Sequence, residues 1–159
     1  MTPGESQFME EMGQVLAAYG MTPMAGRMWA WLLICEPPEQ TAAEIADALG
    51  ASRGAISGTA RILASAGFIK RATRRGDRRE YFSAPPEALE SMLGSATQVY
   101  RQLREMSERG LRAIAHRPVE EQQRLQEFHD VLGFIEREIP LVIDGFIRQR
   151  AAARLASDT

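Results

Sequence analysis

Residues 41–58 read TAAEIADALGASRGAISG, and this stretch decides the fold. Thr41 followed three residues later by Glu44 forms a capping box, which predicts a short helix beginning directly after Thr41. Gly50 can adopt the left-handed conformation that ends such a helix, and Ser52 can cap a second helix. Two short helices joined by a tight turn at a glycine predict a helix-turn-helix.

The two predicted helices, residues 42–49 and 53–66, also contain the side chains that their packing requires. Ala46 supplies a small side chain where the two helices of such a motif cross. The apolar positions that can lock the pair together are Ile45, Leu49, Ala51 and Ile56. The sequence therefore predicts a packed helix pair whose outer surface is available for another role.

The outer side of the second helix combines short side chains with two arginines. Arg53, Ser57 and Arg61 are spaced by four residues and therefore lie along one face. A helix fits a major groove about 12 Å wide, where arginine pairs with guanine and serine reaches phosphates or base edges. The residues predicted to contact DNA on this helix are Ser52, Arg53, Gly54, Ser57 and Arg61. The alternative is that they form only the solvated surface of a helix pair.

A basic hairpin is predicted immediately downstream. Residues 68–73 and 79–83 are two runs with strand propensity, and they flank the turn sequence RRGDR. The arginines that cluster at its tip are Arg74, Arg75, Arg78 and Arg79. They can enter a minor groove or hold the DNA backbone, and Asp77 is predicted to pair with a neighbouring arginine and orient it.

The distribution of charge supports a polyanionic partner, although the whole chain has a formal net charge of −2. Residues 51–83 carry a net charge of +6, whereas residues 1–50 carry −6 and residues 84–159 carry −2. A positive region concentrated in this way is typical of a nucleic-acid-binding surface. The alternative from charge alone is a solvated basic hairpin without a partner.

Further helices are predicted on the N-terminal side of the motif. Thr2 caps a helix that ends near Gly20, and a second helix starts at Thr22 and runs to Glu36. The centre of the second helix has no charged residue, so it is predicted to be buried on most sides.

Two apolar stripes follow the double proline at Pro85 and Pro86. Their steps of three and four residues average 3.5, the repeat of helices that pair along a seam. The first stripe contains Leu89, Met92, Ala96, Val99, Leu103, Met106 and Gly110; the second contains Leu125, Phe128, Leu132, Ile135, Ile139, Val142 and Phe146. Pro140 is predicted to kink or split the second helix. We predict a seam between two chains, and a helix pair within one chain is the alternative.

The sequence contains no motif that indicates an enzyme, a cofactor or a metal site. Its single cysteine and two histidines, Cys35, His116 and His129, exclude an intramolecular disulfide and the usual Cys/His zinc sites. Cys35 is predicted to be a core side chain, with redox sensing as the alternative. No apolar run is long enough to span a bilayer and the N-terminus is acidic, so a cytoplasmic protein is expected.

The motif and its surroundings resemble the MarR-type winged helix-turn-helix regulators. Residues 41–58 carry the resemblance, together with Leu63, Gly67, Ile69 and the sequence GDRR at 76–79. Residues 26–40, GRMWAWLLICEPPEQ, are more similar to the GbsR-like branch, and the Asp-x-Arg of the family's wing falls on Asp77 and Arg79. Gly58 departs from the larger polar residue expected there, and a glycine loosens a helix.

The resemblance implies a mainly α fold with a small β-hairpin wing and terminal dimerisation helices. Residues 1–21 and 85–159 would form the dimerisation region, and residues 22–84 the winged domain. It further implies a homodimeric repressor that binds a pseudo-palindromic operator in double-stranded DNA, and a small-molecule effector of unidentified chemistry. The alternative function is a protein-docking adaptor that does not bind DNA. Side chains that could line an effector pocket, although core packing is the favoured interpretation, are Met21, Met24, Trp29, Trp31 and Tyr100.

Overall fold

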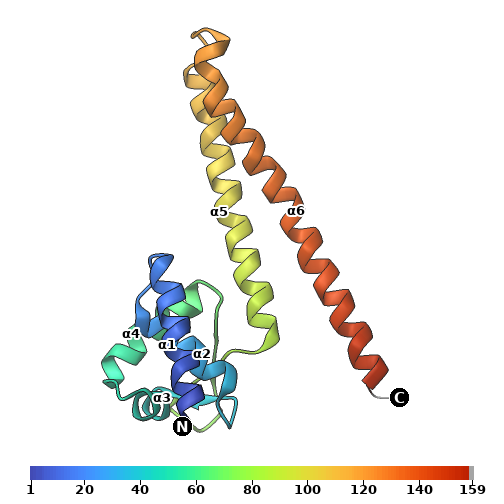
Figure 1. Cartoon of the computed structure of the whole chain (residues 1–159). Helices are drawn as coiled ribbons and strands as arrows, with labels where there is room; N and C mark the ends of the chain where they lie inside the picture. The colour runs from blue at the N-terminus through green and yellow to red at the C-terminus, as the bar shows by residue number, and fades with distance from the viewer. Residues whose placement is uncertain (158–159) are drawn as a thin grey trace. The chain divides into compact units, whose positions relative to one another are not determined.

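The structure, a computed structural model, describes residues 1–157, apart from the side chains of Leu89 and of residues 154–157. The elements, in chain order, are α1 (Pro3–Ala18), α2 (Pro23–Ile34), β1 (Gln40–Thr41), α3 (Ala42–Leu49), α4 (Arg53–Ser65), β2 (Lys70–Thr73), β3 (Glu80–Ser83), α5 (Pro86–Ala113) and α6 (Val119–Ser157) (Figure 1). They form two compact units, Met1–Met92 and Leu93–Thr159.

The predicted helix-turn-helix is present, and local capping explains where its helices begin and end. The Thr41 hydroxyl accepts a hydrogen bond from the backbone N–H of Glu44, while the Glu44 carboxylate accepts one from the backbone N–H of Thr41 at 2.6 Å. Gly50 follows α3 with a φ of 61°, a conformation that glycine adopts without strain. Ser52 caps α4 by accepting from the backbone N–H of Ala55 at 3.2 Å. Both predicted helices are confirmed, and α4 ends one residue before the predicted end.

The core of the first unit lies between α2, α3, α4 and the sheet. Ile45, Ile56 and Leu63 are fully buried there. Leu49, also predicted to lock the helix pair, is buried, and Ala51 packs on the core with part of its surface exposed; Ala46, the small residue predicted at the crossing, is buried as well. Burial of each large aliphatic side chain contributes about 1.5–3 kcal/mol to the free energy of folding. The helix pair is therefore held by its inner face, which leaves the outer face of α4 exposed.

Helices α1 and α2 pack closely because two glycines meet where they cross. A Cβ placed on Gly26 would lie 2.6 Å from the Cα of Gly13. Helix α2 ends at Ile34 rather than at Glu36, since a residue before proline disfavours helical geometry and Pro37 follows. Its first part is buried as predicted, but Leu33 and Ile34 at its end are exposed.

The three strands form an antiparallel sheet in the order β1–β3–β2. The predicted hairpin is present, with Thr73 opposite Glu80 and Gly76 in the turn at a φ of 83°. Strand β1 was not expected from the sequence. It pairs Thr41 with Tyr81, so the first residue of the α3 capping box is also part of the sheet that carries the wing.

The second unit contains a helix pair within one chain, which was the alternative interpretation of the two stripes. Helices α5 and α6 lie next to each other near the turn that joins them and diverge away from it (Figure 1), and a hydrogen bond of 2.9 Å joins Ser107 Oγ to His129 Nδ1. Leu132 is buried. The side chain of Leu89, also assigned to a stripe, lies outside the described residues.

Part of the predicted seam is exposed to solvent in the described residues. Stripe residues that are exposed in the described structure are Val99, Met106, Phe128, Val142 and Phe146. Helix α6 continues through Pro140, so the predicted split of the helix at this proline does not occur. The helix therefore accommodates both the missing backbone hydrogen bond and the steric crowding that an interior proline causes. Among residues 1–157, no helix combines the length and the apolar character needed to cross a bilayer.

Candidate nucleic-acid interface

The outer face of α4 is exposed to solvent. Arg53, Ser57 and Arg61 are all exposed, one turn apart along the helix. The space where a Cβ would stand on Gly54 or Gly58 contains no other atom within 4 Å. The exposed Ser52 hydroxyl accepts the cap hydrogen bond and keeps its own O–H as a donor. Nothing on this face prevents the helix backbone from approaching another surface closely.

A groove of about 480 Å³ joins this face to the wing. Arg53 and Ser57 line it from α4, and Arg78 and Arg79 line it from the wing, across from the start of α3. Residues predicted to contact DNA that lie outside the lining are Ser52, Gly54, Arg61, Arg74 and Arg75. The lining contains three guanidinium groups and one carboxylate, that of Glu80, and this excess of positive charge favours the binding of an anion such as a phosphate.

Asp77 pairs with Arg79, as the sequence predicted for a neighbouring arginine. The Nε of Arg79 donates to Asp77 Oδ2 at 3.0 Å and its Nη2 donates to the same oxygen at 2.8 Å. The backbone N–H of Arg79 also donates to Oδ1 at 2.9 Å. These hydrogen bonds hold the pKa of Asp77 well below its ordinary value, so the carboxylate is ionised at neutral pH.

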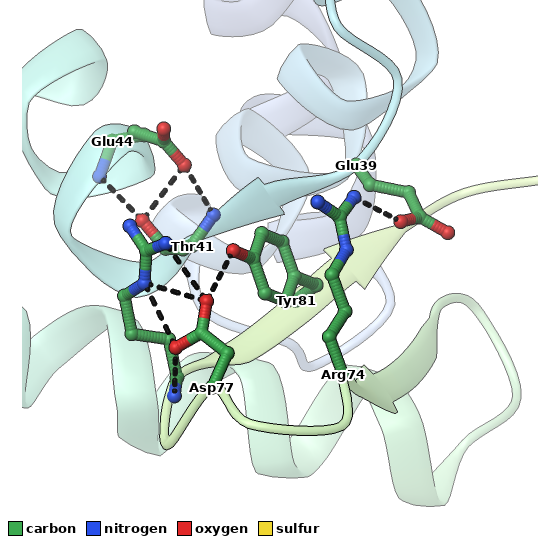
Figure 2. Close-up of polar contacts among 7 residues, drawn as sticks. Glu39, Thr41, Glu44, Arg74, Asp77 and Tyr81 are labelled. Atoms are coloured by element: carbon green, nitrogen blue, oxygen red, sulfur yellow. Dashed lines mark hydrogen bonds and ion pairs between the residues drawn. The ribbon is translucent and has the colours of Figure 1, made fainter.

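Arg74 is held by a different pair of partners. Its guanidinium lies over the ring of Tyr81, 4.0 Å from the ring centroid. Its Nη2 donates to Glu39 Oε2 at 2.9 Å. Figure 2 shows Tyr81 between Asp77 and Arg74, with its hydroxyl directed at the Asp77 carboxylate. The hydrogen bond to Asp77, more than burial, raises the pKa of Tyr81.

The four wing arginines therefore fall into two kinds. Arg74 and Arg79 are held by acidic partners, whereas Arg75 and Arg78 are exposed and pair with no carboxylate in the described part of the chain. Sequence reasoning missed Glu39 and Tyr81. The position of Tyr81 four residues after Asp77 is a signal in the sequence, but the Glu39 contact depends on the pairing of β1 with β3.

The remaining candidate residues fit core roles. Cys35 is buried, its thiol donates to the carbonyl of Pro37 at 3.4 Å, and burial raises its pKa. The rings of Trp29 and Phe68 meet edge to face at 4.8 Å between centroids, and Trp31 Nε1 donates to Gln40 Oε1 at 2.9 Å. Met21 and Met24 also pack against the core, while Tyr100 belongs to the second unit.

A helix-turn-helix followed by a sheet with a basic hairpin defines a winged helix-turn-helix protein. Residues 32–81 match the sequence model of the MarR family, and residues 87–150 match the model described as MmpR5-like MarR family transcriptional regulator. The chain is 37% identical over 137 residues to the HTH-type transcriptional regulator MmpR5 of Mycobacterium tuberculosis, a match covering 86% of this chain and 83% of that protein. The chain belongs to the MarR family of transcriptional regulators and is MmpR5-like.

A solved structure agrees with this assignment. The crystal structure of a transcriptional regulator with 35% sequence identity superposes with a TM-score of 0.85 and covers 92% of this chain and 99% of its own. Members of the family are regulators and not enzymes, in keeping with the sequence motifs.

Proposed function

We propose that this protein is a homodimeric repressor that binds a pseudo-palindromic operator in double-stranded DNA. The observation that carries the proposal is the groove shared by α4 and the wing, where Arg53 and Ser57 face Arg78 and Arg79. A DNA backbone that follows this groove places α4 in the major groove beside it.

The exposed residues divide naturally between reading bases and binding phosphates. On α4, Arg53 and Arg61 reach base edges, and Ser52 and Ser57 donate to phosphates or bases, with Gly54 allowing close approach. The wing arginines, Arg74, Arg75, Arg78 and Arg79, contact the adjacent backbone or minor groove, and Asp77 orients Arg79. These roles are supported by the exposure of each side chain and by its charge.

The exposed stripe of α5 and α6 supports dimerisation through residues 85–159, with residues 1–21 contributing. A two-fold dimer sets its recognition helices about 34 Å apart, so half-sites centred about 10 bp apart are expected. We further propose that a small-molecule effector releases the protein from DNA. We also propose that the protein belongs to the GbsR-like branch and is cytoplasmic. An effector acts by favouring a dimer geometry with a different helix spacing.

Titration of the protein against duplexes selected from a random pool tests the proposal. Binding that selects particular sequences and weakens as salt rises supports it, because released counterions are the source of the salt dependence. A protein that binds no duplex, yet forms a stoichiometric complex with a protein partner, is instead the docking adaptor. Sedimentation tests the dimer separately, and a monomer of 17.7 kDa at micromolar concentration contradicts it.

A further inference from the structure

We propose that Tyr81 is a positioning residue of the DNA interface, which fixes the directions of Arg74 and Arg79 before DNA binds. This inference rests on the proposed function. The inference adds to that function a residue that itself contacts no base or phosphate. It also distinguishes Arg74 and Arg79, which are held in place, from the other two wing arginines.

The hydroxyl of Tyr81 acts on Arg79 through Asp77. It donates to Asp77 Oδ2 at 2.7 Å, and the same oxygen accepts from Nε and Nη2 of Arg79. A carboxylate on a short side chain can rotate about its bonds, but a third donor from a fixed direction restrains it. The direction of the Arg79 guanidinium is therefore set partly by the position of the Tyr81 hydroxyl.

The ring of Tyr81 acts on Arg74 directly. The Arg74 guanidinium lies 4.0 Å from the ring centroid, within the range of a cation–π contact, and Arg79 lies at 5.6 Å. Arginine is well suited to this contact because its guanidinium is planar and weakly hydrated. One aromatic side chain thus contacts the arginines at both ends of the wing turn.

The backbone at Tyr81 is paired with a neighbouring strand on both sides. Tyr81 lies in the central strand β3, where it pairs with Thr41 of β1 on one side and Ala72 of β2 on the other. Only 7% of its surface is exposed, although the arginines that it contacts are mostly exposed. A buried side chain in a central strand provides a rigid support for two flexible ones.

Holding flexible side chains before binding increases affinity, because less rotational freedom is lost in the complex. The gain in affinity requires that the fixed direction of each arginine matches the position of its contact on the DNA. We therefore expect this gain on a selected operator and not on random DNA. Arg75 and Arg78, which have no such support, bind phosphates in any sequence. Each side chain held in advance is worth about a three- to tenfold change in affinity.

The test compares Tyr81→Phe, which keeps the ring and removes the hydroxyl, with Tyr81→Leu, which removes both contacts. Tyr19→Phe is the matched control, since Tyr19 is an exposed tyrosine outside the wing. Two measurements are made on the full chain. The first records the ¹⁵N–¹H signals of the Arg74 and Arg79 Nε groups without DNA, assigned with Arg→Lys variants. The second compares affinity for a selected operator with affinity for random duplex.

We expect Tyr81→Phe to shift the Arg79 signal and to weaken operator binding about threefold, with the Arg74 signal retained. Tyr81→Leu should shift both signals and weaken operator binding about tenfold or more, while binding to random duplex changes little. A merely structural role lowers both affinities equally, together with the thermal midpoint. If Tyr81→Leu does not fold, the isosteric Tyr81→Phe decides the outcome.

Two results are decisive in different ways. A wild-type protein that selects its operator, with Tyr81 variants indistinguishable from it in signals and selectivity, overturns the positioning role and leaves the proposed function intact. A wild-type protein that binds no duplex overturns the proposed function, whatever the Arg79 signals show.

Discussion

Asp77 holds Arg79 through both the side chain and the backbone, with one carboxylate accepting from Nε, Nη2 and the backbone N–H of the same residue. The arginine remains largely exposed while its direction is fixed. A contact of this kind contributes little to the stability of the fold. Its effect is to fix the direction of the Arg79 guanidinium beside the groove.

Asp77→Asn should therefore weaken operator binding but not binding to random DNA. The variant loses the strongest acceptor for Arg79 and also a negative charge, so random duplex binds equally well or more tightly. Equilibrium titration with both duplexes measures the ratio of the affinity for the operator to the affinity for random duplex. Asp47→Asn, an exposed charge change in α3, is the control and should leave that ratio unchanged.

The arginines of α4 and of the wing should differ in what they recognise. Arg53→Ala or Arg61→Ala is expected to cost about 1–3 kcal/mol on the operator and to reduce specificity. Arg75→Ala or Arg78→Ala is expected to weaken binding to all sequences alike and to lower the slope of log affinity against log salt by about 1. Equal losses on operator and random DNA for all four variants would contradict this division.

Glu39→Gln should strengthen binding to every duplex. The substitution removes the carboxylate that pairs with Arg74 and leaves the contact of Arg74 with the Tyr81 ring. Without that carboxylate the charge of Arg74 is no longer partly neutralised where it contacts DNA, so the salt dependence becomes steeper by up to about 1 in slope. Glu36→Gln changes the same charge three residues away and is the control. An equal effect of both variants would point to long-range charge and away from the specific pair.

Substitution by alanine should have opposite effects on the stability of the protein at two glycines. Gly58→Ala is expected to stabilise the protein by up to about 1 kcal/mol, because the site is open and a helix favours alanine. Gly26→Ala is expected to destabilise it by about 1–3 kcal/mol, because the new Cβ would press on Gly13. Denaturant unfolding of both variants measures the difference. Destabilisation by Gly58→Ala would show that α4 is not the regular open helix described above.

The helix pair of the second unit should lose stability in acid. Glu136 accepts from Arg104 Nε at 2.6 Å and from Arg101 Nε at 3.0 Å, and these contacts, that to Arg104 foremost, hold its pKa below the ordinary 4.5. Their contribution is present above about pH 4.5 and is lost as the pH falls through the lower folded value.

Glu136→Gln should accordingly have a lower thermal midpoint than the wild type near pH 7. The two midpoints should converge as the pH is lowered to about 3. Circular dichroism melts across this range test the expectation, with Glu105→Gln as the control. If the difference between the two thermal midpoints did not depend on pH, the ionised carboxylate of Glu136 would be excluded as its cause.

The sequence was most informative where structure is determined locally. The capping boxes at Thr2 and Thr41 each act over three residues, so they place the starts of α1 and α3 correctly. The hairpin followed from the Gly-Asp turn between two strand-forming runs. The fold class was therefore predictable, as was the pairing of Asp77 with an arginine two residues away.

Contacts between distant residues were not predictable in this way. Strand β1 has two residues, too few for a pattern, and it forms because Thr41 pairs with Tyr81 forty positions later. The pairing of Glu39 with Arg74 depends on that strand. For the apolar stripes the repeat predicts helices that pair along a seam, but a repeat of 3.5 residues does not specify whether the partner helix is in the same chain.

The short strand β1 has a mechanical consequence. Because Thr41 both caps α3 and pairs with Tyr81 of β3, the first helix of the motif and the wing are joined through one residue. We therefore expect α3 and the wing to move together, so that a change in the position of one changes the position of the other.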